Sequence, residues 1–532
     1  MNQKTIAGID LGTTFSALAV LNPIGKPEVI PTLGGDRLTA SVVYFPEDDA
    51  GRVQVGLEAK KMAKTEPHRI VQFVKRKMGH PAHRYKIDDR EWSPVEISSL
   101  ILKKLKSECV QNGEIHDVVI TVPAHFDEIQ RRSTMDAGEL AGLNVLGIIN
   151  EPTAAALFYA SQEKVDGKIL VYDLGGGTFD VTLLEIRGQD VTILTSKGDG
   201  LLGGTDFDRE IVRMYSEEHQ RRLGMPLVHA SALDHHNDEI PERHLAQLFK
   251  YLELAESDKR ALSVKPTVNR AISSEHGDIR ITISQEQFEA AISAYIAKTE
   301  MLVETALEDA NLSPSQIDQV ILVGGSTRIP AFVKSLQKMF GKAPSKAINV
   351  DEAVALGAAI SAGLKIREKK PSALPVAVRQ ELDKTRLTDV CNHYFGTIAL
   401  YRDEDTNQVC DRNFIILRKN TKLPCTNKDT FRTVRDNQEI VNFRVTQSSE
   451  DESDPAYVRE IGRFELPLPP ERPKGSPLEV TYSYDTNQIL RCSFTTEDGA
   501  NHEATLAFRE DGMLTQSALK RKAANLNEFQ VD

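Results

Sequence analysis

The sequence has no long apolar run and no excess of positive charge. None of its 532 residues lie in a stretch that approaches the ~20 consecutive apolar residues of a membrane-spanning helix. Lys and Arg number 65 against 77 Asp and Glu, which gives a net charge of −12. An acidic chain lacks the attraction that draws proteins onto nucleic acid. We therefore expect neither a membrane nor a nucleic acid as a partner.

Cysteine is also scarce, since the five cysteines are widely spaced and form no C-x-x-C pair. This excludes the usual zinc and dithiol motifs and predicts buried or idle thiols. The N-terminal residues reach Asp10 after one short apolar stretch, without the apolar core and cleavage pattern of a signal peptide. We therefore expect a cytoplasmic protein.

The length and the average composition, with 40% hydrophobic and 27% charged residues, predict a globular chain of roughly three to four domains. The first two thirds alternate β-branched runs with helical patterns, which is typical of α/β layers. Strands are expected at 117–122, 167–172 and 319–323. A capping box of Ser284 and Gln287 predicts a helix start. The apolar stripe of that helix consists of Phe288, Ile292, Tyr295, Leu302, Val303, Ala306 and Leu307.

The pattern changes after about residue 365. A charged stretch with prolines marks the end of a domain, with a linker somewhere in 366–391. Beyond it apolar and polar residues alternate at 441–445, 478–484, 490–494 and 504–508. This period of two predicts an antiparallel β-sandwich. Residues 513–532 leave room for one short helix at most.

Two segments, Ile6–Val20 and Ile169–Ile186, share one pattern: a strand, Asp-Leu-Gly, a turn of glycine and threonine, and a second strand. Glycines let the backbone approach a ligand, and inward N–H and hydroxyl groups suit phosphate. A single copy would be read as a tight hairpin turn. Two copies predict two related lobes that face one cleft.

A third segment, Val320–Phe340, reads as a strand, Gly-Gly, Ser326 or Thr327 as N-cap, and a helix with Pro330 in its first turn. We expect Phe332, Leu336 and Phe340 to face inward. A helix N-terminus beside a glycine pair favours an anion or a nucleotide.

Other nucleotide motifs are absent or weak. There is no G-x-x-x-x-G-K-[ST], which excludes a P-loop. A G-x-G-x-x-G occurs at 198–203, and Glu217 and Glu218 follow at the spacing of a dinucleotide fingerprint. These acids lie in a helical pattern and not at the end of a second strand, so we do not favour a dehydrogenase.

The motifs IDLGTTFS, DLGGGTFDV and VGGSTRIP, in this order, resemble the three signatures of the seventy-kilodalton heat-shock (Hsp70) chaperones of the actin-like ATPase superfamily. Further matches include FVKRKMG, ITVPAHFDEIQRR and IINEPTAAA. The resemblance is dense to about residue 365 and fades near residue 510. The resemblance implies an α/β two-lobed actin-like ATPase domain at 1–366 and a linker region at 367–391. A substrate-binding antiparallel β-sandwich at 392–512 and a short tail at 513–532 would follow.

The resemblance also implies the site residues. Hydrolysis would depend on Asp10, Lys75, Glu151, Asp173, Thr178 and Asp180. Asp10, Asp173 and Asp180 would hold Mg²⁺ and K⁺, largely through water. ATP or ADP would lie against Gly12, Thr13, Thr14, Gly175, Gly176, Gly177, Glu256, Lys259, Arg260, Ser263, Gly324, Gly325, Ser326, Arg328 and Asp351.

In the sandwich, the positions that match the family's peptide channel are Ile416, Phe431, Val434, Val441 and Phe443, with Val441 at the pocket floor. Any sandwich core needs such residues, so core packing is an equal interpretation for each of them. Pro123, Arg131 and Asp389 match positions that couple the domains.

The chain departs from the family pattern in three ways. Only residues 513–532 follow the sandwich, so we expect no helical lid and fast peptide dissociation. The usual leucine-rich linker is replaced by RLTDVCNHYFGTI, so interdomain docking is expected to be weaker. Gly147 and His125 stand where relatives have arginine and tyrosine. We therefore expect a specialised J-domain partner, if any, beside a nucleotide exchange factor.

The sequence thus predicts an ATP-hydrolysing chaperone that binds extended unfolded polypeptides. The alternative is a specialised ATP-dependent regulator of one dedicated protein partner. A small-molecule kinase on the same fold would not need the sandwich, and a filament-forming actin relative would polymerise with ATP.

Overall fold

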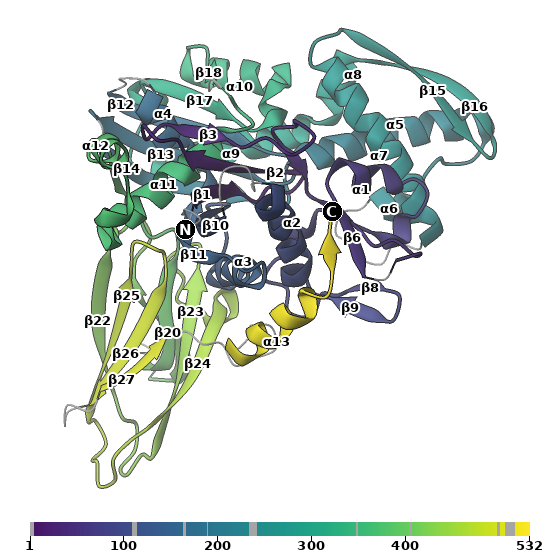
Figure 1. Ribbon diagram of the computed structural model, residues 1–532. Helices are drawn as coiled ribbons and strands as arrows, with labels where there is room; N and C mark the ends of the chain where they lie inside the picture. The colour runs from purple at the N-terminus through teal and green to yellow at the C-terminus, as the bar shows by residue number, and fades with distance from the viewer. Residues whose placement is uncertain are drawn as a thin grey trace.

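The computed structural model describes residues 5–49, 51–108, 114–162, 166–188, 190–233, 242–346, 349–403, 407–496, 501–505 and 516–532. Its larger part has two lobes, each built on a six-stranded sheet (Figure 1). The sheet of lobe I has the order β11-β10-β1-β2-β3, with β4 also paired to β2. These strands are β1 (Thr5–Asp10), β2 (Phe15–Leu21), β3 (Pro27–Val29), β4 (Thr39–Ala40), β10 (Ile115–Val122) and β11 (Asn144–Asn150).

Lobe II repeats this plan in the order β18-β17-β12-β13-β14-β19. Its strands are β12 (Gly167–Leu174), β13 (Phe179–Arg187), β14 (Asp190–Asp199), β17 (Gln319–Val323), β18 (Ser345–Lys346) and β19 (Arg386–Thr388). In each lobe an antiparallel hairpin, β1–β2 or β12–β13, lies beside a parallel strand, β10 or β17. The repeated sequence is therefore a repeated fold, and the three strands expected from the sequence are present.

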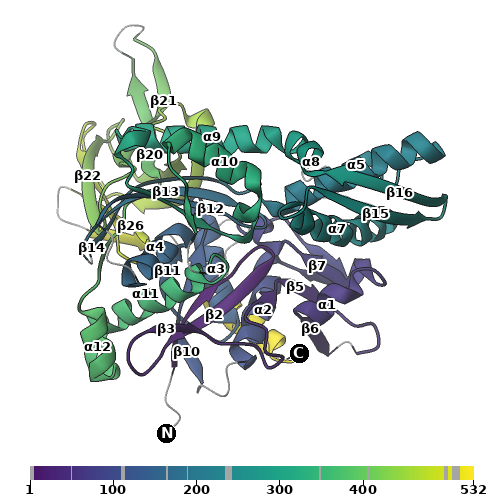
Figure 2. The ribbon, with the colours of Figure 1, turned by 90° about the horizontal axis from the view of Figure 1, so that it is seen from above.

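Two helices join the lobes. They are α4 (Glu151–Gln162) and α11 (Ala353–Lys369), which pack on each other, with α11 against β1 and β2 and α4 against β12 and β13. Figure 2 shows them between the two sheets. Small and branched apolar residues from both helices and both sheets form one buried cluster. This shared core fixes the lobes around the cleft between their hairpins.

The outer helices and strands complete each lobe. Lobe I also contains α1 (Leu57–Met62), α2 (Pro94–Glu108), α3 (Glu128–Leu140) and the strands β5 (Val42–Tyr44), β6 (Arg52–Val55), β7 (Ile70–Gln72), β8 (Tyr85–Ile87) and β9 (Arg90–Trp92). Lobe II contains α5 (Gly204–Leu223), α6 (Ala230–Leu233), α7 (Glu242–Leu262), the hairpin β15 (Thr267–Ser274) and β16 (Gly277–Ser284), α8 (Gln285–Ala291), α9 (Ser293–Asp309) and α10 (Pro330–Phe340).

Two local predictions need correction. The helix that follows the Ser284–Gln287 capping box ends at Ala291, and a second helix begins at Ser293, although the predicted stripe is buried or partly buried. Ser326 and Thr327 are not the N-cap of α10, because a 3-10 helix, Gly325–Arg328, intervenes and Ile329 is the N-cap. Their hydroxyls instead donate to backbone carbonyls. The inward positions Phe332, Leu336 and Phe340 are buried, as predicted.

The segment 367–391, predicted as a linker region, contains regular structure. The helix α11 continues to Lys369, α12 (Val376–Leu382) packs on α11, and β19 extends the sheet of lobe II by pairing with β14. The proposed domain boundary at residue 366 thus falls inside α11.

The second domain is a sandwich of two four-stranded antiparallel sheets, ordered β21-β20-β23-β24 and β22-β25-β26-β27. The strands are β20 (Tyr394–Arg402), β21 (Val409–Leu417), β22 (Cys425–Arg432), β23 (Ile440–Ser448), β24 (Arg459–Pro467), β25 (Pro477–Tyr484), β26 (Leu490–Thr496) and β27 (Asn501–Thr505). The alternating residues at 478–484 and 490–494 bury one face each, as predicted. Leu506 and Phe508 lie outside the described residues.

After the sandwich the chain forms α13 (Gln516–Leu526) and β28 (Gln530–Val531), and it returns to lobe I (Figure 1). The prediction of one short helix at most missed β28. Among the described cysteines, Cys391 and Cys492 are buried, Cys410 is exposed, and none is in a disulfide. Cys109 lies outside the described residues. Within the described part of the chain, every helix is too short or too polar to cross a membrane.

Candidate active site

The two repeated hairpins face each other across the cleft. Asp10 ends β1, and Asp173 lies in β12 directly opposite Asp180 of β13. The turns between the strands touch, because a side chain at Gly176 or Gly177 would collide with Thr14 or Thr13 of the other turn. Glycine is therefore required for the two turns to come this close. The sequence repeat brings the two aspartates, Asp10 and Asp173, to one site.

A buried lysine lies among the carboxyl groups of this site. Lys75, from a 3-10 helix at Val74–Lys77, is only 4% exposed, and its Nζ forms an ion pair with Glu151 at the start of α4. Burial raises the pKa of Glu151 to about 7, against the attraction of Lys75 and with repulsion from Asp10 and Asp180. Burial therefore favours the protonated form of the Glu151 carboxyl group.

The pKa values of Asp10 and Asp173 are raised as well. Burial raises the pKa of Asp10, although Lys75 and a hydrogen bond from Thr121 (Oγ1 to Oδ1, 2.8 Å) lower it. Burial, with repulsion from Glu151, Asp180 and Asp10, raises the pKa of Asp173 well above its ordinary value. One lysine therefore faces four carboxyl groups, and the site lacks positive charge.

A bound cation would supply that missing charge. Hard carboxylate oxygens are the ligands that Mg²⁺ accepts, usually with several waters retained. Within the described ranges, no three acidic, histidine or cysteine side chains are grouped closely enough to hold a metal ion directly. These acids therefore suit Mg²⁺ that they contact through its bound water molecules. The assignment of Asp10, Asp173 and Asp180 as metal-binding residues stays a prediction.

The cleft is a cavity of about 1070 Å³. Of the predicted catalytic and nucleotide-binding residues, all line it except Gly177 and Asp180. Asp180 lies behind the wall, where its Oδ1 is 3.1 Å from Nδ1 of His125. The carbonyl of Gly177 accepts a hydrogen bond from Arg76. Neither residue faces the cavity directly.

One end of the cavity is lined by α7 and by the segment after β17. Lys259 is held by Asp208 (2.8 Å), Glu256 pairs with Lys60 of lobe I (2.7 Å), and Arg328 pairs with Asp351 (2.7 Å). Ser326 Oγ donates to the carbonyl of Gly175 in the second hairpin turn (2.8 Å). The residues predicted for adenosine therefore lie together, joined to the phosphate turns.

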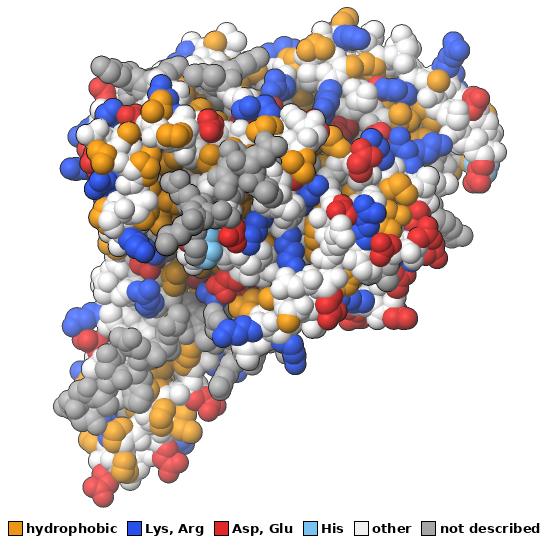
Figure 3. All heavy atoms as spheres, in the orientation of Figure 1, with side chains coloured by type: hydrophobic (Ala, Val, Ile, Leu, Met, Phe, Trp, Pro, Cys, Tyr) orange, Lys and Arg blue, Asp and Glu red, His pale blue; other side chains and the backbone are white. Residues whose placement is uncertain are grey.

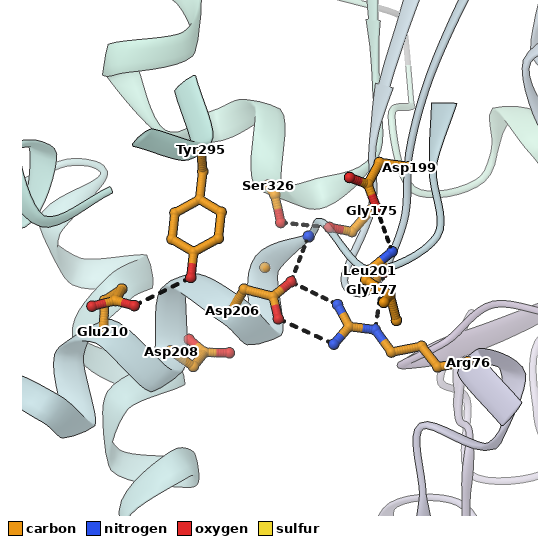
Figure 4. A network of polar contacts seen from close by, with 12 residues as sticks. Arg76, Gly175, Gly177, Asp199, Leu201, Asp206, Asp208, Glu210, Tyr295 and Ser326 are labelled. Carbon is orange, nitrogen blue, oxygen red and sulfur yellow. Dashed lines mark hydrogen bonds and ion pairs between the residues drawn. The ribbon is translucent and has the colours of Figure 1, made fainter. Parts of the chain in front are cut away.

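Sequence reasoning missed the contacts that join the lobes. Arg76 of lobe I makes a two-pronged ion pair with Asp206 of α5 (3.1 and 2.6 Å), shown in Figure 4. Arg37 pairs with Glu352 in the same way (Nη2 to Oε2, 2.6 Å). Arg76 lies inside the FVKRKMG motif that matches the family, so the sequence could have marked it as a site residue. Nothing near Arg37 marked it.

The G-x-G-x-x-G segment serves this same site. It begins in the last two residues of β14, which pairs antiparallel with β13, whereas a dinucleotide fingerprint needs a parallel βαβ unit. The backbone N–H groups of Gly204 and Thr205 donate to the carbonyls of Gly175 and Gly176 (3.0 and 2.8 Å). Of the motif's own glycines, Gly203 packs against the second turn, because a Cβ there would lie 2.5 Å from the backbone N of Gly177.

The predicted peptide-binding residues lie in the sandwich at different depths. Ile416 and Phe443 are buried, Phe431 and Val441 are partly buried, and Val434 is 50% exposed. All except Val434 belong to or pack against the sandwich core. Core packing therefore accounts for most of this set, and their contact with peptide stays a prediction.

The sandwich is docked on the two-lobed domain through a chain of hydrogen bonds. Arg131 of α3 donates to Gln488 of the sandwich, and Gln488 Nε2 donates to Asp389 before β20 (2.6 Å). Arg131 also donates to Asn150 Oδ1 and to the carbonyl of Phe126. Two predicted coupling residues are thus joined by one that the sequence did not mark. Pro123 contributes its carbonyl to the turn before α3.

Gly147, where relatives have arginine, lies at the same interface. A Cβ there would lie 3.0 Å from Oδ1 of Asn487 and 3.1 Å from Nζ of Lys365. Lys365 Nζ donates to Asn487 Oδ1 (2.7 Å) and to the carbonyl of Thr486 (3.1 Å). The absence of a side chain at residue 147 leaves room for this interdomain contact.

The face in Figure 3 shows positive and negative side chains interspersed over both domains.

The fold and the cleft define a two-lobed ATPase of the actin-like class that carries a β-sandwich. The sequence matches the family described as Hsp70 protein over residues 6–532. It is 36% identical to the chaperone protein DnaK of Thermotoga neapolitana, and 36% to that of Thermotoga maritima. Each match covers 99% of this chain and 84% of the relative.

The chain belongs to the Hsp70 family. The predicted fold class, an actin-like ATPase domain with a β-sandwich, is confirmed. So are ATP-dependent chaperone function and ATP hydrolysis with Mg²⁺. Unfolded polypeptides, J-domain proteins and exchange factors are confirmed as its kinds of partner.

Proposed function

We propose that this chain hydrolyses ATP at the junction of its two hairpins and thereby controls how tightly its sandwich holds extended polypeptides. This proposal rests on the placement of Lys75 with Asp10, Glu151 and Asp173 in a cavity between the lobes, with Asp180 buried behind the cavity wall. Triphosphate and Mg²⁺ together match the charge of such a site.

Each side chain has a role that its chemistry suits. Lys75 positions the attacking water and offsets charge on the terminal phosphoryl oxygens. Glu151 orients water, and Thr178 donates to the terminal phosphate. Asp10, Asp173 and Asp180 would hold hydrated Mg²⁺ and K⁺, and the metal would supply positive charge that offsets the phosphates.

The remaining cavity residues bind the rest of the nucleotide. The backbone N–H groups of Thr13, Thr14 and Gly176 cradle the phosphates. Glu256, Lys259, Arg260 and Ser263 lie on one side of adenosine, with Gly324, Gly325, Ser326, Arg328 and Asp351 on the other.

We assign polypeptide binding to the sandwich, with an extended segment held by main-chain hydrogen bonds and one apolar pocket. Val441 forms the pocket floor, and Val434, which is half exposed and lies before β23, contacts the segment. We assign the control of release to the Arg131–Gln488–Asp389 chain, because in it Arg131 of lobe I reaches across to the sandwich.

A J-domain partner of this protein must tolerate Gly147 in place of arginine, and we propose a specialised one. A cytoplasmic location is proposed on the family alone. Stimulation of ATP turnover by a general J-domain protein would contradict the proposed specialisation.

Hydrolysis in a single turnover tests the proposal directly. Lys75→Ala should slow hydrolysis by about 10² to 10³-fold, as loss of a preorganised charge does, while ADP affinity changes little. Lys77→Ala, on the same 3-10 helix but outside the cavity lining, is the matched control. Unchanged hydrolysis in the Lys75 variant would reject its role. Steady-state turnover should also rise when an unfolded polypeptide is added to the wild type.

A further inference from the structure

The strand β6 of lobe I pairs along one edge with residues 530–531, near the end of the described chain. Its sheet has the order β28-β6-β5-β7, and β28 is residues 530–531. The N–H groups of Gln530 and Asp532 donate to the carbonyls of Gly51 and Val53 (2.9 Å each), and Val55 N–H donates to the Asp532 carbonyl (2.8 Å). The side chains of Arg52 and Asp532 form an ion pair. An otherwise open sheet edge thus receives a strand.

An aromatic pocket receives the residue before this strand. The ring of Phe529 lies edge-on to Trp92 with centroids 5.3 Å apart. The guanidinium of Arg90 lies 3.9 Å from the centroid of Trp92 and 4.9 Å from that of Phe529. Trp92 is only 2% exposed, so Phe529 is part of what shields it. Stacking and cation–π attraction favour an aromatic side chain here.

The helix α13 fixes the approach to the pocket. Leu519 and Leu526 are buried in the core of lobe I, and Lys522 pairs with Glu96 (3.1 Å). Lys103 Nζ donates to the carbonyl of Leu526 at the helix end (2.8 Å). In Figure 1 this segment runs from beneath α3 to the edge of β6. It joins the sandwich to lobe I by a second route, remote from β19.

The sheet that accepts β28 also positions Lys75. The strand at its other edge is β7, which pairs with β5 through Tyr44 and Ile70. The 3-10 helix that carries Lys75 begins two residues after β7 ends. A strand added at one edge orders the sheet as a whole, because each strand is held by its neighbours.

We propose that β6, Arg90 and Trp92 form a strand-accepting peptide site on the ATPase domain, whose ligand is Phe529–Asp532 of the same chain and whose occupancy holds Lys75 in place for hydrolysis. The ligand class is an extended segment with an aromatic residue, an apolar residue two positions later and a carboxylate next. A two-residue strand makes few ladder hydrogen bonds, so the segment is releasable. The hydrolytic part of this inference rests on the function proposed above.

The single tryptophan of the chain makes the site observable by fluorescence. Gln530→Pro removes the N–H that donates to Gly51, and Phe529→Ala removes the ring over Trp92. Both full-length variants should shift Trp92 emission to the red and slow single-turnover hydrolysis about fivefold, as loosened positioning does. Lys520→Ala, at an exposed position on α13 outside this segment, should change neither. A synthetic peptide of residues 516–532 should restore both signals in Gln530→Pro.

Emission equal to wild type in both variants would overturn the site, whatever the rate of hydrolysis. A red shift with unchanged hydrolysis would overturn the link to Lys75. If a variant unfolds at lower temperature, the added peptide decides: restored emission supports a peptide site, and emission that stays red-shifted overturns it. Because Trp92 emission needs no ATP, failure of the site and failure of the proposed hydrolysis are distinguishable.

Discussion

Glu128 illustrates how single residues link the two domains. It opens α3, its N–H donates to Gln447 of the sandwich (3.0 Å), and its carboxyl group is buried at the interface. Burial raises the pKa of Glu128 to about 7, although Arg131 and a hydrogen bond from the Leu490 backbone lower it. A carboxyl group with a raised pKa binds its proton more tightly in the folded protein than in the unfolded chain.

This shift predicts a pH dependence of stability. Between pH 4.5 and 7 the folded protein holds a proton on Glu128 that the unfolded chain has lost, so the free energy of unfolding falls as pH rises through this window. The loss is up to about 3 kcal/mol. Glu128→Gln removes this pH-dependent loss. The free energy of unfolding of the variant, relative to wild type, should therefore be higher at pH 7.5 than at pH 5. Urea unfolding at both pH values measures this, and a difference independent of pH would contradict it.

Individual site residues were predictable where a motif carried them. Asp10, Lys75, Glu151 and Asp173 stand in motifs whose order identifies the family, and the structure brings them together. Gln488 was not predictable, because it is one residue in a turn and acquires its role only when Arg131 and Asp389 reach it from distant parts of the chain.

Secondary-structure elements follow from the sequence unless tertiary contacts intervene. The hairpins, the capping box at Ser284 and the sandwich alternation came from local patterns. The break at Ile292 did not, because an apolar stripe continues through it. β28 was missed because two residues have no period and pair with β6 only through the fold.

The helix α1 and the residues just after it close the cleft against α7. Lys60 pairs with Glu256 (2.7 Å) and Lys64 with Glu253 (2.8 Å), which joins lobe I to lobe II at the mouth of the cavity. Removing both lysines with Lys60→Ala and Lys64→Ala should speed nucleotide release about fivefold, since partly exposed pairs contribute up to ~1 kcal/mol each.

Stopped-flow displacement of a fluorescent ADP measures this rate. Lys61→Ala is the control, because Lys61 pairs with Glu58 inside α1 and does not reach lobe II. Equal release rates for the double variant and the control would show that these pairs do not hold the cleft closed.

At the scale of the molecule, the sandwich is held to both lobes. Lobe I contributes Arg131 and Glu128, and lobe II contributes Lys197 and Asp309, which pair with Glu450 and Lys419. Burial and the neighbouring Lys197 lower the pKa of Lys419 to about 8. The sequence predicted the two domains but not this docking, because its contacts join residues far apart in the chain. The altered linker predicted weaker docking. The linker is only one of the regions through which the sandwich contacts the two lobes.

The central claim is that a nucleotide in the cleft changes the affinity of the sandwich for polypeptide. The most direct measurement is the Kd of a fluorescent extended peptide with saturating ATP, in the hydrolysis-deficient Lys75→Ala protein, and with ADP. We expect binding to be about tenfold weaker with ATP, a coupling of ~1.4 kcal/mol. Gln488→Ala should largely remove that difference. Equal affinity with ATP and ADP in the Lys75→Ala protein would contradict the account.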